Sequence, residues 1–179
     1  MGAVVVLVAV AGWMALAYNG LVRRRNRVES TWSDIDVLLR RRHDLVPNLV
    51  STVGGYAAHE SATLRAVTNA RAAALAAPDP AAKGIAESTL SDSVKSVFAV
   101  AEAYPNLKAS DAFVRLQEQL TETEDGLEHA RQFYNDAVYG YTNATQTLPT
   151  SLVAGLFRFA PRQYFQAAGR ERAAVTVRP

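Results

Sequence analysis

Three histidines with carboxylates nearby in the sequence are the residues best suited to chemistry, because such groups can bind a divalent metal and activate water. Their spacing does not fit the known helical metal sites. Di-iron bundles use a Glu-x-x-His spacing, and no histidine of this chain has a glutamate three residues before it. His59-Glu60 begins like the His-Glu-x-x-His motif of zinc proteases, but no second histidine follows it. The candidates for a site assembled from scattered residues are His43, Asp44, His59, Glu60, Asp125 and His129.

Other common reactive groups are absent from the sequence. The chain has no cysteine, no Gly-x-Ser-x-Gly nucleophile elbow and no glycine-rich phosphate loop. Asp125 and His129 are four residues apart and could share a helix face, but one such pair is a weak metal site. We therefore predict a non-enzymatic protein with no catalytic residue, no metal and no cofactor. A metal-dependent or other hydrolytic enzyme is the alternative hypothesis.

The charges are unevenly distributed along a chain whose net charge is only +2. Four arginines stand between residues 23 and 27, and the tail from Arg158 onward has five arginines against Glu171. Residues 28–157 carry ten basic and sixteen acidic side chains. A nucleic-acid groove needs a continuous basic stripe, so nucleic acid is not expected as a partner. Basic ends are better suited to a membrane surface.

Residues 3–22 contain no charged side chain, and about 20 apolar residues suffice to cross the hydrocarbon core as a helix. The competing interpretation is a cleaved signal peptide, because Ala15-Leu16-Ala17 fits the A-x-A cleavage pattern. Met1-Gly2 provides no basic n-region, and arginines follow soon after the cleavage point, so we favour an uncleaved signal-anchor. The positive-inside rule then places the rest of the chain in the cytoplasm.

Apolar residues recur at the helical spacing of three and four in three stretches, without strand-like alternation. Such narrow stripes are not stable alone, so the helices must pack as a bundle. Ala76–Gly84, with two prolines and a glycine, is predicted to be a loop, and Tyr104-Pro105 should end the second helix. The stripes are Val28, Trp32, Ile35, Leu39, Val46, Leu49, Val53, Tyr56, Leu64 and Val67; Ile85, Leu90, Val94, Val97, Phe98 and Ala101; and Phe113, Leu116, Leu120, Leu127, Tyr134, Val138, Tyr141 and Leu148.

Pro47 allows two interpretations of the first stretch. Its missing N–H and its ring disturb the preceding turn, so it could kink one long helix whose apolar phase continues from Val46 to Val53. Alternatively, Asp44 could cap a new helix with Pro47 in its first turn, which would give four helices of similar length. The pattern alone leaves both open.

Arg42 falls on the first stripe, where an apolar side chain is expected. An unpaired buried charge is strongly unfavourable, so its guanidinium must reach water or an acidic partner. The third helix offers Glu118, Glu124 and Glu128 as partners. We interpret the polar residues around Pro47 as contacts that fix helix register, with a partner-binding surface as the second interpretation.

The residues from Tyr18 to Glu60 resemble the signature of the LemA family of bacterial membrane proteins. Matching segments include Tyr18-Asn19-x-Leu21-Val22, Trp32-Ser33-x-Ile35-Asp36-Val37 and Pro47-Asn48-Leu49-Val50. The similarity continues through Ala70-Arg71, Tyr104-Pro105 and Tyr134-Asn135 to Phe157-x-Phe159, which is nearly the whole chain. It identifies a candidate structural or interaction motif made of Tyr18, Asn19, Arg25, Asn26, Trp32, Asp36, Arg41, Arg42, Asp44, Pro47 and Asn48.

The resemblance implies an all-α fold, with an N-terminal transmembrane helix followed by an elongated antiparallel four-helix bundle. It favours an extra helix formed near Pro47 and implies no catalytic residue. We expect an anchor at 1–22, a bundle at 23–157 and a basic, aromatic-containing tail at 158–179 that is flexible or lies on the membrane.

Family members include a magnetosome-associated protein, and others resemble genomic neighbours of membrane zinc peptidases. The expected role is therefore a scaffold or accessory protein at the inner membrane. Its expected partners are the lipid bilayer and another protein, such as a membrane protein or peptidase.

Overall fold

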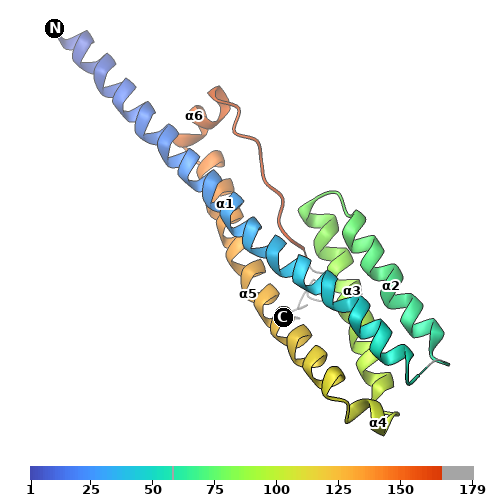
Figure 1. The fold of residues 1–179 in the computed structure, drawn as a ribbon. Helices are drawn as coiled ribbons and strands as arrows, with labels where there is room; N and C mark the ends of the chain where they lie inside the picture. The colour runs from blue at the N-terminus through green and yellow to red at the C-terminus, as the bar shows by residue number, and fades with distance from the viewer. Residues whose placement is uncertain (58, 167–179) are drawn as a thin grey trace, which may run out of the picture. The chain divides into compact units, whose positions relative to one another are not determined.

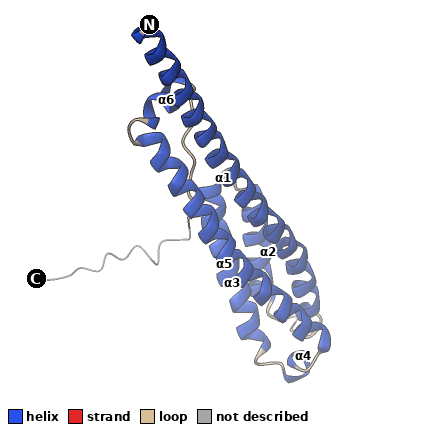
Figure 2. Ribbon diagram, turned by 90° about the vertical axis from the view of Figure 1, so that its left-hand side faces the viewer, coloured by secondary structure: helices blue, strands red, loops and turns tan. Residues whose placement is uncertain are grey.

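The computed structural model describes residues 1–57 and 59–166. Throughout these residues the regular structure is helical and no strand occurs, which confirms the all-α prediction (Figure 2). The helices, labelled in Figure 1, are α1 (Gly2–Gly54), α2 (Ser61–Ala76), α3 (Pro80–Ala101), α4 (Pro105–Lys108), α5 (Asp111–Gln146) and α6 (Thr150–Leu156).

The chain forms two compact units, and both contain parts of α1 and α5. Unit 1 consists of Met1–Ile35 and Ala130–Tyr164. Unit 2 consists, among the described residues, of Asp36–His129 together with Phe165 and Gln166.

Unit 2 is a bundle of four helical segments with one apolar core. The end of α1, all of α2 and α3, and the start of α5 lie side by side, and consecutive segments run in opposite directions (Figure 1). Each contributes apolar residues at the spacing that a helix requires for an inner face, and Ala57 and Leu107 add to the core from the connections. The buried core comprises Val46, Leu49, Val53, Ala57, Val67, Ala70, Ala74, Leu90, Val94, Val97, Ala101, Leu107, Phe113 and Leu120.

The helix break in unit 2 lies beyond Pro47. Helix α1 passes through Pro47 without interruption and ends at Gly54, and α2 begins at Ser61. Pro47 therefore does not separate two helices, and the extra helix comes from the break after Gly54. The apolar spacing predicts a first stretch that continues to Val67, because Tyr56 and Leu64 stay in phase, whereas α1 ends at Gly54. Tyr56 is instead half exposed in the connection.

The predicted loop at 76–84 is shorter in the structure. The side chain of Asp79 accepts a hydrogen bond from the backbone N–H of Ala82 at 2.9 Å, and Pro80 occupies the first turn. An aspartate cap followed by proline is a favourable helix start, so residues 80–84 are helical rather than loop. Ile85, the first residue of the second predicted stripe, is 48% exposed, because the buried face of α3 contains Gly84 and Glu87 instead.

Unit 1 combines the beginning of α1 with the end of α5 and with α6 (Figure 1). One apolar cluster of this unit contains the buried residues Leu21, Val153 and Ala154, with Met14 and Ala17 packed against them. Leu148, the last residue of the third predicted stripe, is exposed because α5 already ends at Gln146.

Within the described residues, α1 is the one helix long and apolar enough to cross a membrane. Its most apolar 18-residue stretch has a mean hydropathy of 1.9, and very little of that stretch is buried. The apolar side chains from Val4 to Val8 are each more than half exposed.

Candidate functional site

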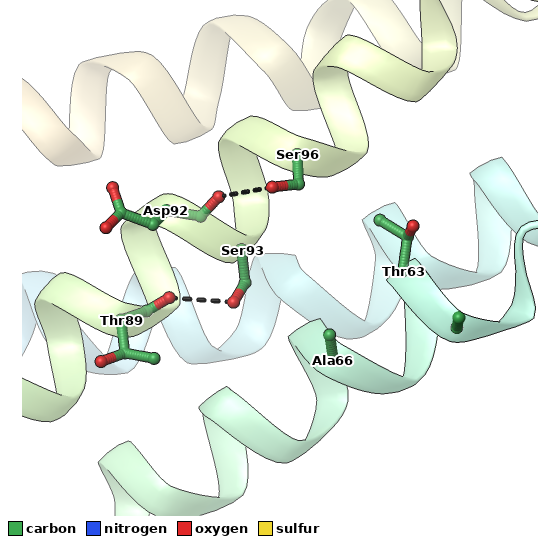
Figure 3. Close-up of a pocket in the computed structure, with 7 residues that line it drawn as sticks. Thr63, Ala66, Thr89, Asp92, Ser93 and Ser96 are labelled. Carbon is green, nitrogen blue, oxygen red and sulfur yellow. Dashed lines mark hydrogen bonds between the residues drawn. The ribbon is translucent and has the colours of Figure 1, made fainter.

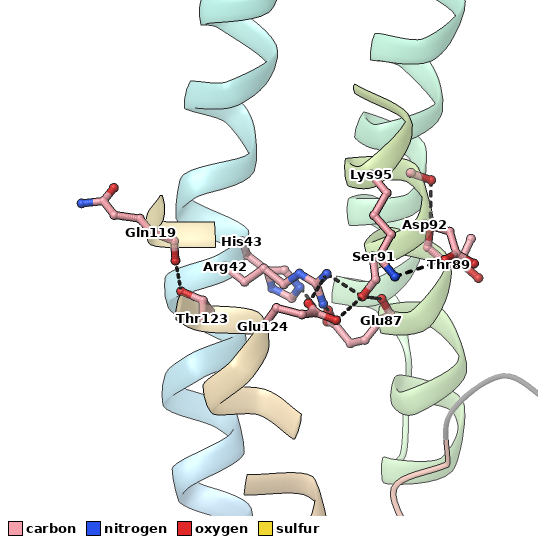
Figure 4. A network of polar contacts seen from close by, with 11 residues as sticks. Arg42, His43, Glu87, Thr89, Ser91, Asp92, Lys95, Gln119, Thr123 and Glu124 are labelled. Carbon is pink, nitrogen blue, oxygen red and sulfur yellow. Dashed lines mark hydrogen bonds and ion pairs between the residues drawn. The ribbon is translucent and has the colours of Figure 1, made fainter. Parts of the chain in front are cut away.

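A buried polar network occupies the middle of unit 2, centred on Arg42 of α1. One guanidinium nitrogen of Arg42 lies 3.3 Å from Oε2 of Glu87 on α3. The other donates to Oγ of Ser91 at 2.6 Å and lies 2.8 Å from Oε2 of Glu124 on α5. Figure 4 shows these side chains converging from three helices. Glu124 was one of three partners predicted for Arg42, and the structure confirms it.

His43 enters the same network from the next position on α1. Its Nε2 lies 2.7 Å from Oε1 of Glu87, and both side chains are buried. An ionised carboxylate only accepts hydrogen bonds, so Nε2 donates when Glu87 is ionised. Arg42 and His43 thus take one carboxylate oxygen each, and Glu87 joins two adjacent residues of α1 to α3.

Ser91 completes the connections between the helices. Its hydroxyl lies 2.9 Å from Oε1 of Glu124 and 3.1 Å from the backbone carbonyl of Glu87. Buried charges are tolerated when they are paired and their remaining polar atoms are hydrogen-bonded. Because each member has a partner on another helix, the network joins α1, α3 and α5.

Pro47 makes a further contact between α1 and α2 possible, because it leaves a backbone carbonyl of α1 without its usual donor. Proline has no N–H, so the carbonyl four residues earlier, that of His43, loses its usual intrahelical donor. Nε of Arg71 on α2 donates to that carbonyl at 2.8 Å. The proline therefore leaves an acceptor on α1 that α2 uses, and all four segments of the bundle are joined at this level.

The rest of the candidate motif in unit 2 lies on the surface. Arg41 pairs with Glu122 of α5 at 2.7 Å, and Asp36 pairs with Arg40 one turn later. The side chains of Asp44 and Asn48 are exposed. Of the motif residues in unit 2, Arg42 alone has a buried side chain, Asp36 is partly buried, and Arg41 and Pro47 are exposed.

In unit 1 the motif residues Tyr18 and Arg25 meet the chain that follows α6. The ring of Tyr18 lies 4.8 Å from that of Phe157 and 5.7 Å from that of Phe159, measured between centroids. The guanidinium carbon of Arg25 lies 5.7 Å from the Phe159 ring centroid, within the range of a cation–π contact. These residues form an aromatic cluster at the end of the apolar stretch of α1. Asn19 and Asn26 are exposed beside it.

Two tyrosines of α5 hold the segment after α6 in place. Tyr141 donates to the carbonyl of Ala160 and Tyr134 donates to that of Gln163, both at 2.8 Å. Tyr134 and Tyr141 are seven residues apart on α5, a rise of about 10 Å. Their acceptors are three residues apart, and three extended residues also span about 10 Å, so both bonds fit one extended segment of the chain. Burial raises the pKa of both tyrosines, against the opposing effect of Arg162.

Trp32, another motif residue, also packs on this part of α5. Its ring lies 5.3 Å from the ring of Tyr134, at an interplanar angle of 56°. Tilted aromatic pairs at this distance are favourable, so the tryptophan joins α1 to α5 within unit 1.

The candidates for hydrolytic chemistry are not brought together. His43 is occupied by Glu87, while Asp44, His59, Asp125 and His129 are exposed and Glu60 is half-buried. Among residues 1–57 and 59–166, no group of three or more histidines and carboxylates lies close enough to hold a metal ion. The alternative enzyme hypothesis gains no assembled site from the described residues.

A surface hollow between α2 and α3 is lined by one carboxylate, that of Asp92, and otherwise by alanine and hydroxyl side chains (Figure 3). Two of its hydroxyls donate to their own helix: Ser93 to the Thr89 carbonyl at 2.9 Å and Ser96 to the Asp92 carbonyl at 3.0 Å. Hydroxyls bonded in this way are ordinary features of helices. The hollow is lined by Ala62, Thr63, Ala66, Thr89, Asp92, Ser93 and Ser96.

Three residues of the polar network were missed by reasoning from the sequence. Glu87 and Ser91 lie one turn apart on the buried face of α3, in phase with Val94, and this phase was the available signal. A second stripe that begins at Ile85 does not include Glu87 and Ser91. No sequence signal pointed to Arg71, because its acceptor exists only through the geometry around Pro47.

Fold and site together define a helical-bundle protein with a long apolar first helix and a core ion network. Residues 31–178 match the LemA family, and the chain belongs to that family. It is also similar to magnetosome proteins MamQ 1 and MamQ 2 of Paramagnetospirillum magneticum. Each is 23% identical to it over 186 residues, an alignment that covers 89% of this chain and 68% of the relative.

Proposed function

We propose that the chain is a membrane-anchored, non-enzymatic helical scaffold or accessory protein, which docks a protein partner or organises the membrane surface. The observation that carries this proposal is the exposure of the first part of α1. Val5, Leu7 and Val8 are each about two thirds exposed, on a helix that lacks charge until Arg23. Apolar surface of this length is favourable in hydrocarbon and unfavourable in water.

The arginines that follow the apolar stretch support an orientation for the bundle. Arginines close to a membrane helix favour the cytoplasmic side, so residues 23 onward are assigned to the cytoplasm. An active periplasmic reporter fused to the C-terminus would contradict this assignment.

The satisfied polar network supports a non-enzymatic role. A catalytic group must reach a substrate, whereas Arg42, His43 and Glu87 are buried and occupied by one another. Elemental analysis of the purified chain tests the hydrolase alternative. A stoichiometric metal that is lost on His129→Ala would overturn the proposal.

The partner is assigned to another protein, such as a membrane protein or peptidase, that meets the exposed face of unit 2. The three lysines of the chain, Lys83, Lys95 and Lys108, all lie in this unit. Lysine links from amine-reactive crosslinking in intact membranes therefore report on the bundle, and links through the N-terminal amine of Met1 are set aside by their peptide mass. We expect one reproducible set of partner peptides linked to these lysines by mass spectrometry.

The matched control is a chain in which all three lysines are replaced by arginine, which keeps the charge and removes the reactive amine. Partner peptides that disappear in this control were linked through these lysines. An accessory subunit gives a single obligate partner, whereas a scaffold gives several. Links to abundant membrane proteins only, unchanged in the control, would contradict partner docking.

A further inference from the structure

We propose that α6 lies in the membrane interface and places an apolar face, made of Leu148, Leu152, Leu156 and Phe157, among the lipid acyl chains. The inference rests on the proposed membrane anchor. It assigns a second lipid-binding element to the chain, besides α1.

The helix α6 has two different sides. Val153 and Ala154 are buried against the α1 residues Leu21, Met14 and Ala17. Leu152 and Leu156, four residues apart, share the opposite side and are 67% and 65% exposed. Leu148, just before the helix, is 76% exposed, and Phe157, just after it, is 48% exposed.

The position of α6 along α1 gives its depth in the bilayer. At about 1.5 Å per residue, residues 3–22 of α1 match the ~30 Å hydrocarbon core. The contact residues Met14, Ala17 and Leu21 lie in the last part of this stretch, and Arg23 follows within one turn. The exposed face of α6 therefore continues the apolar surface of α1 where hydrocarbon meets the headgroups.

The charges around α6 are complementary to anionic headgroups. Arg23 and Arg24 on α1 are exposed, as is Arg158, which adopts a left-handed backbone (φ 54°) directly after Phe157. No acidic residue occurs among residues 1–28 or 137–166. An apolar surface bordered by arginines without carboxylates fits a membrane containing anionic lipid.

These contacts also change which aromatic residues are available to lipid. Phe159 packs against Tyr18 and Arg25 in unit 1, and Phe165 is buried in unit 2. The sequence suggested the tail as the lipid-binding element, but its arginines Arg170, Arg172 and Arg178 lie outside the described residues. The described residues add α6 as a lipid-contacting element beside the predicted tail.

The absence of cysteine allows a direct depth measurement on the full-length chain. Leu152→Cys carries a nitroxide spin label on α6, and Val10→Cys carries one within the apolar stretch of α1. Leu75→Cys on α2 is the matched control, since Leu75 is also an exposed leucine on a helix, 52% exposed, but lies in unit 2. Each labelled chain is reconstituted into bilayers that contain phosphatidylglycerol.

We expect the labels at positions 10 and 152 to be relaxed preferentially by oxygen, and the label at position 75 by a water-soluble nickel chelate. If the label at position 152 is as accessible to nickel as the label at position 75, the role of α6 is overturned. The anchor is left intact in that case, provided that the label at position 10 is still in lipid. A label at 10 that is accessible to nickel would refute the anchor itself.

Two further measurements complete the test. Dipolar broadening between labels at position 152 would show that a second copy covers α6, which would overturn lipid contact. In neutral phosphatidylcholine bilayers the label at 152 should become more accessible to nickel. Equal accessibility in both lipids would overturn the role assigned to Arg23, Arg24 and Arg158.

Discussion

His43 and Glu87 lie 2.7 Å apart between Nε2 and Oε1, in the interior of a four-helix bundle where both side chains are buried. Glu87 also faces Arg42, the residue next to His43, so one carboxylate serves two adjacent residues of α1. Such an arrangement makes the removal of the carboxylate far more costly than the loss of an ordinary ion pair.

Glu87→Ala should therefore destabilise the protein by about 3–5 kcal/mol, because it leaves buried cationic and polar groups without a partner. Glu122→Ala is the matched control: it removes an equally short ion pair, with Arg41, that is exposed. Exposed pairs contribute roughly 0–1 kcal/mol. Chemical denaturation of the detergent-solubilised chain measures the free energy of unfolding of both variants. Equal decreases would show that the buried network contributes no more to stability than an exposed ion pair.

Apolar replacement of the three buried ionisable residues Arg42, His43 and Glu87 together should behave differently from removal of one of them. In Arg42→Met, His43→Leu, Glu87→Leu no unpaired buried charge is left, and such exchanges are typically neutral or stabilising by about 1–4 kcal/mol. We expect this triple variant to be at least as stable as the wild-type chain in the same denaturation assay. A loss comparable to that of Glu87→Ala would instead mean that the network is needed for stability.

Pro47 and Arg71 should be energetically coupled, because Arg71 occupies the His43 carbonyl that Pro47 leaves free. In the wild-type chain Arg71→Ala should cost about 1.5–3 kcal/mol, the usual range for a hydrogen bond from a charged group. In a Pro47→Ala background the restored N–H satisfies the carbonyl, so the same change should cost about 1 kcal/mol less. A double-mutant cycle measures the coupling, and additive effects would contradict this role of the proline.

Gly84 should not tolerate a side chain, although it lies inside α3. A Cβ at this position would come within 2.0 Å of the backbone oxygen of Gln166. Gly84→Ala should therefore displace the backbone beside the buried Phe165 and cost roughly 1–3 kcal/mol. Gly155→Ala in α6 meets nothing within 4 Å and should stabilise its helix by about 0.5–1 kcal/mol. Thermal unfolding of the two variants should give shifts of opposite sign.

The tyrosines that hold the segment after α6 should make stability depend on alkaline pH. Burial raises the pKa of Tyr134 and Tyr141 above the ordinary value of 10.0. The unfolded chain therefore loses these protons first, so their contribution is complete below about pH 10 and is lost as pH rises through the folded pKa values.

The free energy of unfolding, followed from about pH 9 to about pH 12, should show this decrease. The double variant Tyr134→Phe, Tyr141→Phe should weaken the pH dependence, while Tyr139→Phe, at an exposed tyrosine, should leave it unchanged. A decrease of the same size in the wild-type chain and in both variants would assign it to other groups.

Periodicity predicted most of the bundle, since Ile35, Leu39, Val46, Leu49 and Val53 are all buried as their spacing indicated. It could not locate the end of α1, because Tyr56 and Leu64 happen to continue the apolar phase across a break. The start of α3 was missed for a local reason, the capping bond of Asp79, which outweighed the composition of the predicted loop.

The polar network was predictable only in part. Arg42 on an apolar stripe required a partner, and Glu124 was among the residues named for it. The roles of Glu87 and Arg71 depend on how helices distant in sequence are placed against one another. A single sequence carries no direct information on such pairs.

The membrane anchor is tested most directly by the intact mass of the polypeptide recovered from carbonate-washed membranes. An anchored scaffold should remain in the membrane fraction and retain residues 1–22 in its mass. A soluble polypeptide that begins at Tyr18 would contradict the anchor, because the apolar stretch would then be a removed signal peptide.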